Sequence, residues 1–169
     1  MSVGRASRKW QVAFGVAGAV IVLDRLTKMA VASRMDLHQS IPVIEGFAAL
    51  TYVRNSGVAF GLFAGHGLAF RVPLLLGVSA FAVTLLVWFL RGIAPERHLL
   101  VAACGAVLGG AIGNMIDRVA LGEVIDFVDL SLGAYHWPAF NVADAAITLG
   151  VALLCLDAAR KPAPSRALS

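Results

Sequence analysis

Charged residues are scarce in this chain. Asp, Glu, Lys and Arg together make up 14% of its 169 residues, while 59% of the residues are hydrophobic. Its mean hydropathy is +0.82. A soluble domain carries about a quarter charged residues, so this chain cannot cover itself with a water-facing surface. The composition therefore excludes an ordinary soluble protein and indicates an integral membrane protein, with residues 1–169 forming one domain.

Cysteine and histidine are also sparse. The two cysteines, Cys104 and Cys155, each lie in an apolar run, and neither they nor the four histidines have the spacing of metal ligands. We predict two buried, inert thiols and no bound metal. A zinc protease is disfavoured because no His-Glu-x-x-His sequence occurs. A serine protease is disfavoured because Ser79 lacks a partner histidine on a plausible helix face. The net charge of +4 is small and its placement does not favour nucleic-acid binding.

Four apolar stretches approach the length that is needed to cross a bilayer. A hydrocarbon core of about 30 Å requires about 20 residues of helix. The stretches cover about residues 10–33, 72–90, 98–116 and 139–156. Backbone polar groups must be paired internally in lipid, so we predict a membrane all-α core of four transmembrane helices.

The positions of Lys and Arg predict the orientation. Eight of the fourteen basic residues lie in the N-terminal tail, in the connection between the second and third helices, and in the C-terminal tail. Because basic residues mark the cytoplasmic side, we predict that both termini are cytoplasmic. The longer connections, about residues 34–71 and 117–138, then lie outside. We expect a disordered tail at about residues 160–169.

A cleaved secretory signal peptide is an alternative for the N-terminus. A basic tail, an apolar run and Ala30-Val31-Ala32 occur in the required order. However, Asp24, Arg25 and Lys28 would place charge just before the cleavage site, which disfavours cleavage. A mature protein that begins at Ser33 would establish it.

The two outer connections differ in character. Residues 41–54 contain two strand-like runs with Pro and Gly between them, and Asn55-Ser56-Gly57 is typical of a turn. We therefore predict a small extracytoplasmic β-sheet from the first connection. The second connection is predicted as a periplasmic loop.

Polar residues within the predicted helices are costly in a bilayer and are candidates for function. Several share a helix face because they are spaced by three or four residues. The groups are Asp24, Thr27 and Lys28; Asn114, Asp117 and Arg118; and Asn141 with Asp144, while Asp126 stands in the second connection. With the predicted topology, all of these residues fall near the outer face.

Two of these acids can form a catalytic pair. When two aspartates face each other, one can act as general base on a water molecule and the other as general acid toward the carbonyl oxygen or the leaving amine. Such a pair hydrolyses a peptide bond without a metal or a covalent intermediate. Asp126, from a loop, and Asp144, from a helix end, can converge in this way.

Other roles remain open for the acids. Proton or cation transport would need a polar path across the bilayer, and residues 72–90 contain no ionisable side chain. A non-enzymatic scaffold gives no reason for so many buried acids. Asp117 and Arg118 could instead form structural ion pairs with Asp24 and Lys28.

A glycine repeat and two further acids are predicted to have no catalytic role. Gly105, Gly109 and Gly113 recur every four residues, which permits close helix approach. Glu123 and Asp129 are predicted as surface residues.

Five motifs occur in one order along the chain. They are Asp24-Arg25-Leu26-Thr27-Lys28, Asn55-Ser56-Gly57-Val58-Ala59-Phe60, Gly113-Asn114-Met115-Ile116-Asp117-Arg118, Val124-Ile125-Asp126-Phe127 and Phe140-Asn141-Val142-Ala143-Asp144. Together they closely resemble the bacterial lipoprotein signal peptidase family, signal peptidase II, over about residues 10–156. Each motif is weak alone, but five in this order are a strong match.

The resemblance implies an aspartic endopeptidase of the bacterial inner membrane, without a cofactor. Its substrates would be prolipoproteins whose lipobox cysteine already carries diacylglycerol, and it would cut immediately before that cysteine. Its partners would be these substrates and membrane lipids, and we expect a monomer. By motif, the catalytic pair would be Asp126 and Asp144. Site-lining residues would be Asn55, Asn114, Arg118 and Asn141, and supporting residues would be Asp24, Lys28, Asp117 and Gly113.

Overall fold

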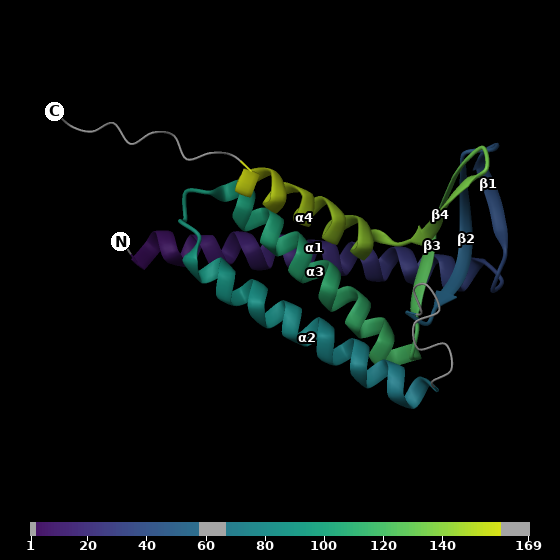
Figure 1. The fold of residues 1–169 in the computed structure, drawn as a ribbon, viewed down its shortest axis with the longest axis horizontal. Helices are drawn as coiled ribbons and strands as arrows, with labels where there is room; N and C mark the ends of the chain where they lie inside the picture. The colour runs from purple at the N-terminus through teal and green to yellow at the C-terminus, as the bar shows by residue number, and fades with distance from the viewer. Residues whose placement is uncertain (1–2, 58–66, 160–169) are drawn as a thin grey trace.

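A helical bundle carries a small sheet at one end (Figure 1). The computed structural model describes residues 3–57 and 67–159. Its elements, in order, are α1 (Val3–Arg34), β1 (Ser40–Ile44), β2 (Ala48–Asn55), α2 (Leu68–Gly92), α3 (His98–Leu121), β3 (Val124–Leu132), β4 (Tyr135–Phe140) and α4 (Val142–Ala159). The tail predicted at about residues 160–169 lies outside the described residues, and so do residues 58–66 of the first connection.

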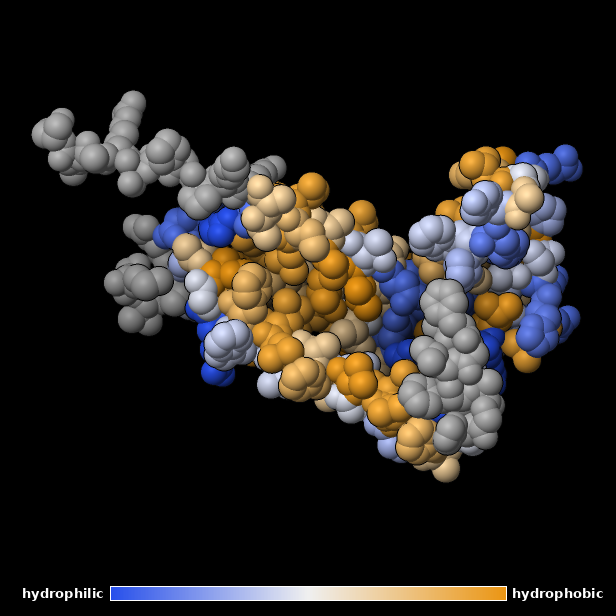
Figure 2. All heavy atoms as spheres, viewed as in Figure 1, coloured by the Kyte–Doolittle hydropathy of each residue, from blue (hydrophilic) through white to orange (hydrophobic). Residues whose placement is uncertain are grey.

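Three helices in the described part of the chain are long and apolar enough to cross a membrane. They are Ala69–Gly92, His98–Leu121 and Val142–Ala159. The helix α1 is longer, at 32 residues, but it carries charged side chains along its length. Hydrophobic residues cover the visible face of the bundle, and hydrophilic residues gather at both of its ends (Figure 2). This distribution is that of a membrane protein.

The helices extend beyond several predicted bounds. The helix α1 begins at Val3 rather than near residue 10, and α3 continues to Leu121 rather than ending near residue 116. The end of α3 therefore includes residues 117–121, which the sequence analysis counted with the second connection. The predicted bounds followed the apolar residues, but a helix continues through charged residues where these find partners. The helix α4 begins later than predicted, at Val142, because Asn141 caps it.

The sheet is antiparallel, with strand order β1-β2-β3-β4. The first connection supplies β1 and β2, so the predicted small sheet is confirmed. The second connection was predicted as a loop, and this was wrong, because it forms β3 and β4. The register places Val53 of β2 opposite Asp126 of β3. Val, Ile and Phe favour a half-buried strand, and they surround Asp126 in β3.

Small residues allow α1 and α3 to approach closely. A Cβ atom built on Gly105 would lie 2.5 Å from the carbonyl oxygen of Ala13, and one built on Gly109 would lie 2.6 Å from that of Ala17. Real Cβ atoms do not occur at these distances, so only glycine fits. The close helix approach predicted from the glycine spacing is present.

A buried cluster attaches the sheet to the end of α1. Its members are Val31, Met35, Tyr52, Ile125 and Phe127. Because Ile125 and Phe127 point into this cluster and alternate residues of a strand point to opposite faces, Asp126 faces the other way. The cluster therefore fixes the strand that carries Asp126 over the ends of the helices.

The two cysteines differ in exposure. Cys104 is buried against α1, as predicted, whereas Cys155 is exposed. The prediction for Cys155 was wrong because a helix of a membrane protein is apolar on its outward face as well as on its packed face. An apolar run therefore does not show which residues are buried.

Candidate active site

Polar residues that the spacing and the family motifs predict for the site meet where the helices reach the sheet. The helix α1 supplies Asp24 and Lys28, α3 supplies Asn114, Asp117 and Arg118, β2 supplies Asn55, β3 supplies Asp126, and the start of α4 supplies Asn141 and Asp144. Hydrogen bonds and ion pairs connect these side chains into one group.

Asp126 is the most enclosed acid on the sheet. Its residue is 1% exposed. Its Oδ1 accepts a hydrogen bond from Asn141 Nδ2 at 2.7 Å, and its Oδ2 accepts one from Asn55 Nδ2 at 3.0 Å. Val53 of β2 is the cross-strand neighbour of Asp126, and Asn55 lies two residues later on the same face of β2. The Asn55 side chain is therefore a diagonal neighbour of Asp126 and can reach its carboxyl group.

Burial changes the acidity of Asp126. It raises the pKa of this carboxyl from its ordinary value of 3.8 to about 6. The hydrogen bonds from Asn55 and Asn141 favour the charged form and act in the opposite direction, and the negative charge of Asp144 raises the pKa further. A low-dielectric site that disfavours a carboxylate is the usual way to obtain an acid that holds a proton near neutral pH.

Asp144 is fixed by the start of α4. Asn141 is the N-cap, and its Oδ1 accepts a hydrogen bond from the Asp144 backbone N–H at 2.9 Å. In return, Asp144 Oδ2 accepts one from the Asn141 backbone N–H at 3.3 Å. This reciprocal arrangement is a capping box, which satisfies two donors at the start of a helix and holds both side chains.

Two asparagines join the acids. The Asn141 side chain that binds Asp126 Oδ1 also caps α4, and its Nδ2 lies 3.2 Å from Asn114 Oδ1. Asn114 Nδ2 in turn donates to Asp144 Oδ1 at 2.7 Å. Each carboxyl group is therefore held by amides that contact one another.

A buried ion network lies beneath these amides. Lys28 Nζ is 2.8 Å from Asp24 Oδ2 and 2.8 Å from Asp117 Oδ2, and all three side chains are 0% exposed. The same ammonium donates to Asn114 Oδ1 at 3.0 Å. Removing one partner of such a network costs about 3–5 kcal/mol because a charge is left buried without compensation.

Asp24 and Asp117 also bind the backbone of α4 and β3, the two elements that carry the candidate catalytic acids. Asp24 Oδ1 accepts a hydrogen bond from the Ala143 backbone N–H at 3.0 Å, at the start of α4. Asp117 Oδ2 accepts one from the Ile125 backbone N–H at 3.2 Å, in β3. A Cβ on Gly113 would lie 2.8 Å from Asp24 Oδ2, so glycine at this position leaves room for the carboxylate.

The spacing of residues in the sequence assigns no role in the site to Arg25. Its Nη1 forms an ion pair with Asp117 Oδ1. The motif that contains Asp24 and Lys28 includes Arg25, but spacing within one helix cannot reveal a partner 92 residues away.

Arg118 does not take part in the structural ion pairs that were offered as an alternative for it. Its Nη1 lies 3.4 Å from the Asn114 carbonyl oxygen, and its charge interacts with Asp144, Asp126 and Asp117 without a direct contact. Among the described residues, its buried Nε has no hydrogen-bond partner. The guanidinium therefore retains donor capacity beside the two candidate catalytic acids.

Asp129 is less exposed than predicted. Its side chain is 20% exposed, and its Oδ1 is 3.1 Å from His136 Nε2 on the neighbouring strand. This residue, predicted at the surface, is partly buried because the second connection is a strand pair rather than a loop. Within residues 3–57 and 67–159, no three His, Cys, Asp or Glu side chains are grouped as metal ligands would be.

Comparison with known proteins identifies the family. Residues 16–160 match the family model described as signal peptidase (SPase) II. The chain belongs to the signal peptidase II family. The lipoprotein signal peptidase of Syntrophus aciditrophicus is 47% identical over 145 residues, which cover 86% of this chain and 90% of that protein. The lipoprotein signal peptidase of Geobacter sulfurreducens is 48% identical over 141 residues, which cover 83% and 87%.

Solved structures of bacterial membrane enzymes resemble this chain. A bacterial membrane enzyme solved by the in meso method has a TM-score of 0.78 to this chain at 31% identity, and the match covers 89% of this chain and 94% of that one. A second such structure has a TM-score of 0.76 at 31% identity, with 93% and 94% covered. Both matches show that this chain shares its fold with solved bacterial membrane enzymes.

In this signal peptidase II chain, the two candidate acids occupy unlike environments. Asp126 is enclosed between a strand and two amides, whereas Asp144 is half-buried at a helix start. Pairs of carboxyl groups whose surroundings differ in this way can divide the roles of acid and base.

Proposed function

We propose that this protein cleaves its substrate with Asp126 and Asp144 as the catalytic pair. As a member of the signal peptidase II family, it is a lipoprotein signal peptidase, an aspartic endopeptidase that removes signal peptides from prolipoproteins. The observation that most supports the pair is the position of Asn141. Its side chain binds Asp126 and its backbone binds Asp144, so one residue sets both carboxyl groups.

In the form of the enzyme that reacts, Asp126 carries the proton, and this form becomes less populated as the pH rises above about 6. Burial, which raises the pKa of this carboxyl to about 6, supports the assignment. Asp144 then acts as the general base.

The reaction follows from this arrangement. Asp144 takes a proton from a water molecule, whose oxygen adds to the scissile carbonyl carbon, while Asp126 donates its proton to the carbonyl oxygen. The tetrahedral product collapses when Asp126 regains that proton and Asp144 passes its own to the leaving amine. The C–N bond breaks, both carboxyl groups return to their initial states, and one water molecule is consumed.

The remaining polar side chains position the substrate. Asn55 and Asn114 each contact one acid, so movement of either amide would misplace a reacting group. Arg118 retains donor capacity that suits a peptide carbonyl oxygen. Preorganised donors of this kind contribute substantially to transition-state stabilisation.

The substrate is a prolipoprotein whose lipobox cysteine carries diacylglycerol, and the bond cut lies immediately before that cysteine. An acyl-anchored cysteine is held at the membrane surface. The candidate acids lie at that depth, because the polar group forms where the apolar helices meet the sheet (Figure 2).

The protein acts in the bacterial inner membrane as a monomer, with four spans, cytoplasmic termini and its site near the periplasmic face. The connection between α2 and α3, which contains Arg97, lies at the same end of the bundle as the described start of α1 and the end of α4 (Figure 1), and Arg91 lies in the last turn of α2. Basic residues gather on the cytoplasmic side in this way. The helix α1 crosses despite its charges because Asp24 and Lys28 neutralise each other inside the protein.

Cleavage of a defined substrate tests this function. Purified protein in detergent would be incubated with a prolipoprotein in two forms, with and without diacylglycerol on its cysteine, and the products analysed by mass spectrometry. We expect one new N-terminus, at the lipidated cysteine, and no product from the unmodified form or with Asp144→Asn. Cleavage at another bond, or equal cleavage of both forms, would contradict the proposal.

A further inference from the structure

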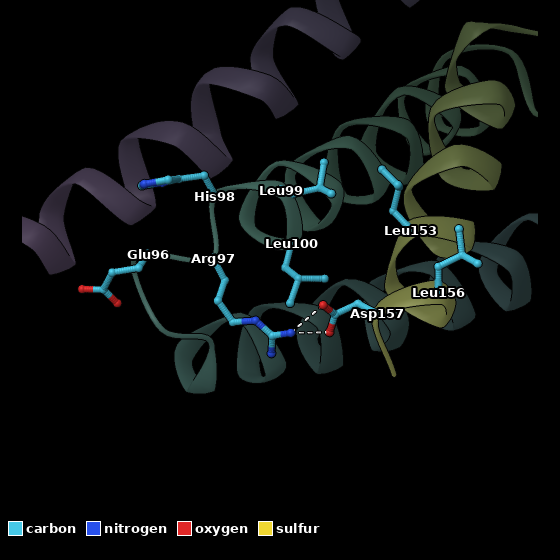
Figure 3. Close-up of a pocket in the computed structure, with 8 residues that line it drawn as sticks. All are labelled: Glu96, Arg97, His98, Leu99, Leu100, Leu153, Leu156 and Asp157. Atoms are coloured by element: carbon cyan, nitrogen blue, oxygen red, sulfur yellow. Dashed lines mark hydrogen bonds and ion pairs between the residues drawn. The ribbon is translucent and has the colours of Figure 1, made fainter. Parts of the chain in front are cut away.

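A cavity at the opposite end of the bundle has no part in the proposed chemistry. It has a volume of about 750 Å³ and lies where α2 ends and α3 begins. Its lining includes Trp88, Arg91, Arg97 and Asp157. A smaller cavity of about 330 Å³ shares Arg97 and Asp157 with it (Figure 3). Both lie far from Asp126 along the helices.

The cavity has the charge to hold an anion. It is lined by two guanidinium groups and one carboxylate. Arg97 uses one nitrogen, Nη2, for both of its contacts with Asp157, at 2.5 and 2.6 Å (Figure 3). Arg91 is exposed, and within the described residues its guanidinium has no ion pair. Arginine forks suit the geometry of a phosphate group.

Lys9 removes the main obstacle to an anion here. The carboxyl end of a helix carries partial negative charge, which would repel a phosphate. The buried Lys9 Nζ donates to the carbonyl oxygens at that end of α2: those of Leu90 at 3.0 Å, Arg91 at 3.1 Å and Ile93 at 2.9 Å. The ammonium group therefore neutralises the helix end that forms the wall of the cavity.

An apolar groove continues from the cavity along the bundle. It has a volume of about 340 Å³ and is lined only by apolar residues of α2, α3 and α4, among them Leu86, Val107 and Val151. Phe89 lines both the groove and the cavity. Trp88, which is 71% exposed beside them, is the residue type found at the boundary of a membrane. A polar head and apolar chains would thus find adjoining sites.

We propose that this cavity and groove bind one anionic phospholipid from the membrane leaflet on the side of the two chain termini. Its phosphate lies between Arg91 and Arg97, and one acyl chain lies along the groove past Phe89. The other hydrophobic molecule that could lie in the groove is the signal peptide of a substrate. Its flanking region is basic, and two arginines at the cavity would repel it. The orientation of the protein in the membrane would explain the basic residues at this end. It would not explain the cavity or the groove that adjoins it.

Lipid binding by the full chain tests the proposal. Native mass spectrometry and thermal unfolding would be measured with phosphatidylglycerol, with phosphatidylcholine of the same acyl chains, and with inorganic phosphate. We expect one phosphatidylglycerol molecule per chain and a rise in unfolding temperature. Arg91→Gln should weaken this binding about fivefold, the factor expected for one basic residue near an anionic lipid, and Arg91→Lys should retain most of it. Arg34→Gln, an exposed arginine at the end of α1 next to the sheet, is the matched control and should have no effect.

Cleavage of the lipidated substrate should be unchanged in Arg91→Gln, which separates this site from the proposed catalytic pair. Equal binding of the two lipids, or full binding by Arg91→Gln, would overturn the proposal. Displacement of the lipid by inorganic phosphate would overturn it in favour of a free-anion site, and displacement by a signal peptide would overturn it in favour of a substrate site.

Discussion

Asp126 is held in a place that suits catalysis better than stability. Its pKa, raised by burial from 3.8 to about 6, means that the folded protein holds this proton more tightly than the unfolded chain does. The folded state therefore loses stability as the pH rises from about 4 to about 6, and the full loss is present above pH 6. A difference of this size corresponds to about 3 kcal/mol at most.

The substitution Asp126→Asn should consequently raise the thermal unfolding temperature at pH 7.5. Asparagine resembles the neutral acid, so the gain should shrink as the pH falls toward 5, where the wild-type carboxyl is protonated. The measurement is thermal unfolding in detergent across this pH range. Asp36→Asn, at an exposed acid outside the site, should show no such change. An Asp126→Asn variant that is less stable than wild type at pH 7.5 would show that the site does not penalise the charge.

Asn141 combines two tasks that a pair of substitutions can separate. Serine can still cap α4 but has no amide to donate to Asp126, whereas alanine loses both. Asn141→Ser should reduce cleavage about tenfold or more while nearly retaining stability, and Asn141→Ala should lose a further 1 kcal/mol or so of stability. The measurements are the cleavage rate and the unfolding temperature of each variant. Equal unfolding temperatures for the two variants would argue against the capping role.

Residue spacing located the acids and amides but not their contacts. The i, i+3 spacing of Asn141 and Asp144 placed them together, and the structure shows that this spacing makes a capping box. The link from Asn141 to Asp126 depends on the pairing of β3 with β4, which places Phe140 opposite Val128 and which single-helix patterns do not encode. The ion pair of Arg25 with Asp117 was missed for the same reason.

The helices were predictable as elements because their apolar runs are long. The strands β3 and β4 were not, because Asp126 and Asp129 interrupt the apolar pattern and the chain gives no turn sequence as clear as that after β2. The strand β3 is hydrogen-bonded to both β2 and β4, and the pairing of β3 with the distant β2 cannot be seen in a local window of sequence.

Close packing of α1 on α3 determines where Lys28 meets Asp117. Gly109→Ala should destabilise the protein by about 1–3 kcal/mol, because the new Cβ would lie 2.6 Å from a backbone oxygen of α1 that cannot move alone. Gly77→Ala is the matched control, since a Cβ there meets nothing within 4 Å and alanine favours a helix. Unfolding temperature in detergent is the readout. Equal effects of the two substitutions would contradict the proposed close contact.

The whole molecule has one polar group at each end of an apolar bundle. Labelling of single cysteines at the two ends tests which end faces the periplasm. Single cysteines would be placed at Ser40, in β1, and at Ala94, between α2 and α3, in a Cys104→Ala, Cys155→Ala background. A membrane-impermeant maleimide should modify Ser40→Cys in cells with a permeabilised outer membrane, and Ala94→Cys only after the inner membrane is disrupted. The reverse pattern would place the candidate site on the cytoplasmic side.

The central claim is that Asp126 and Asp144 act as one catalytic unit. Cleavage rates of a diacylglyceryl-modified prolipoprotein would be measured for Asp126→Asn, Asp144→Asn and the double variant, with each fold verified by its thermal unfolding and Asp129→Asn as control. Members of a catalytic unit are non-additive, so we predict that each single variant loses about 10³-fold or more and that the double variant is no slower than either. Substantial activity in either single variant, or losses that multiply in the double variant, would contradict the account.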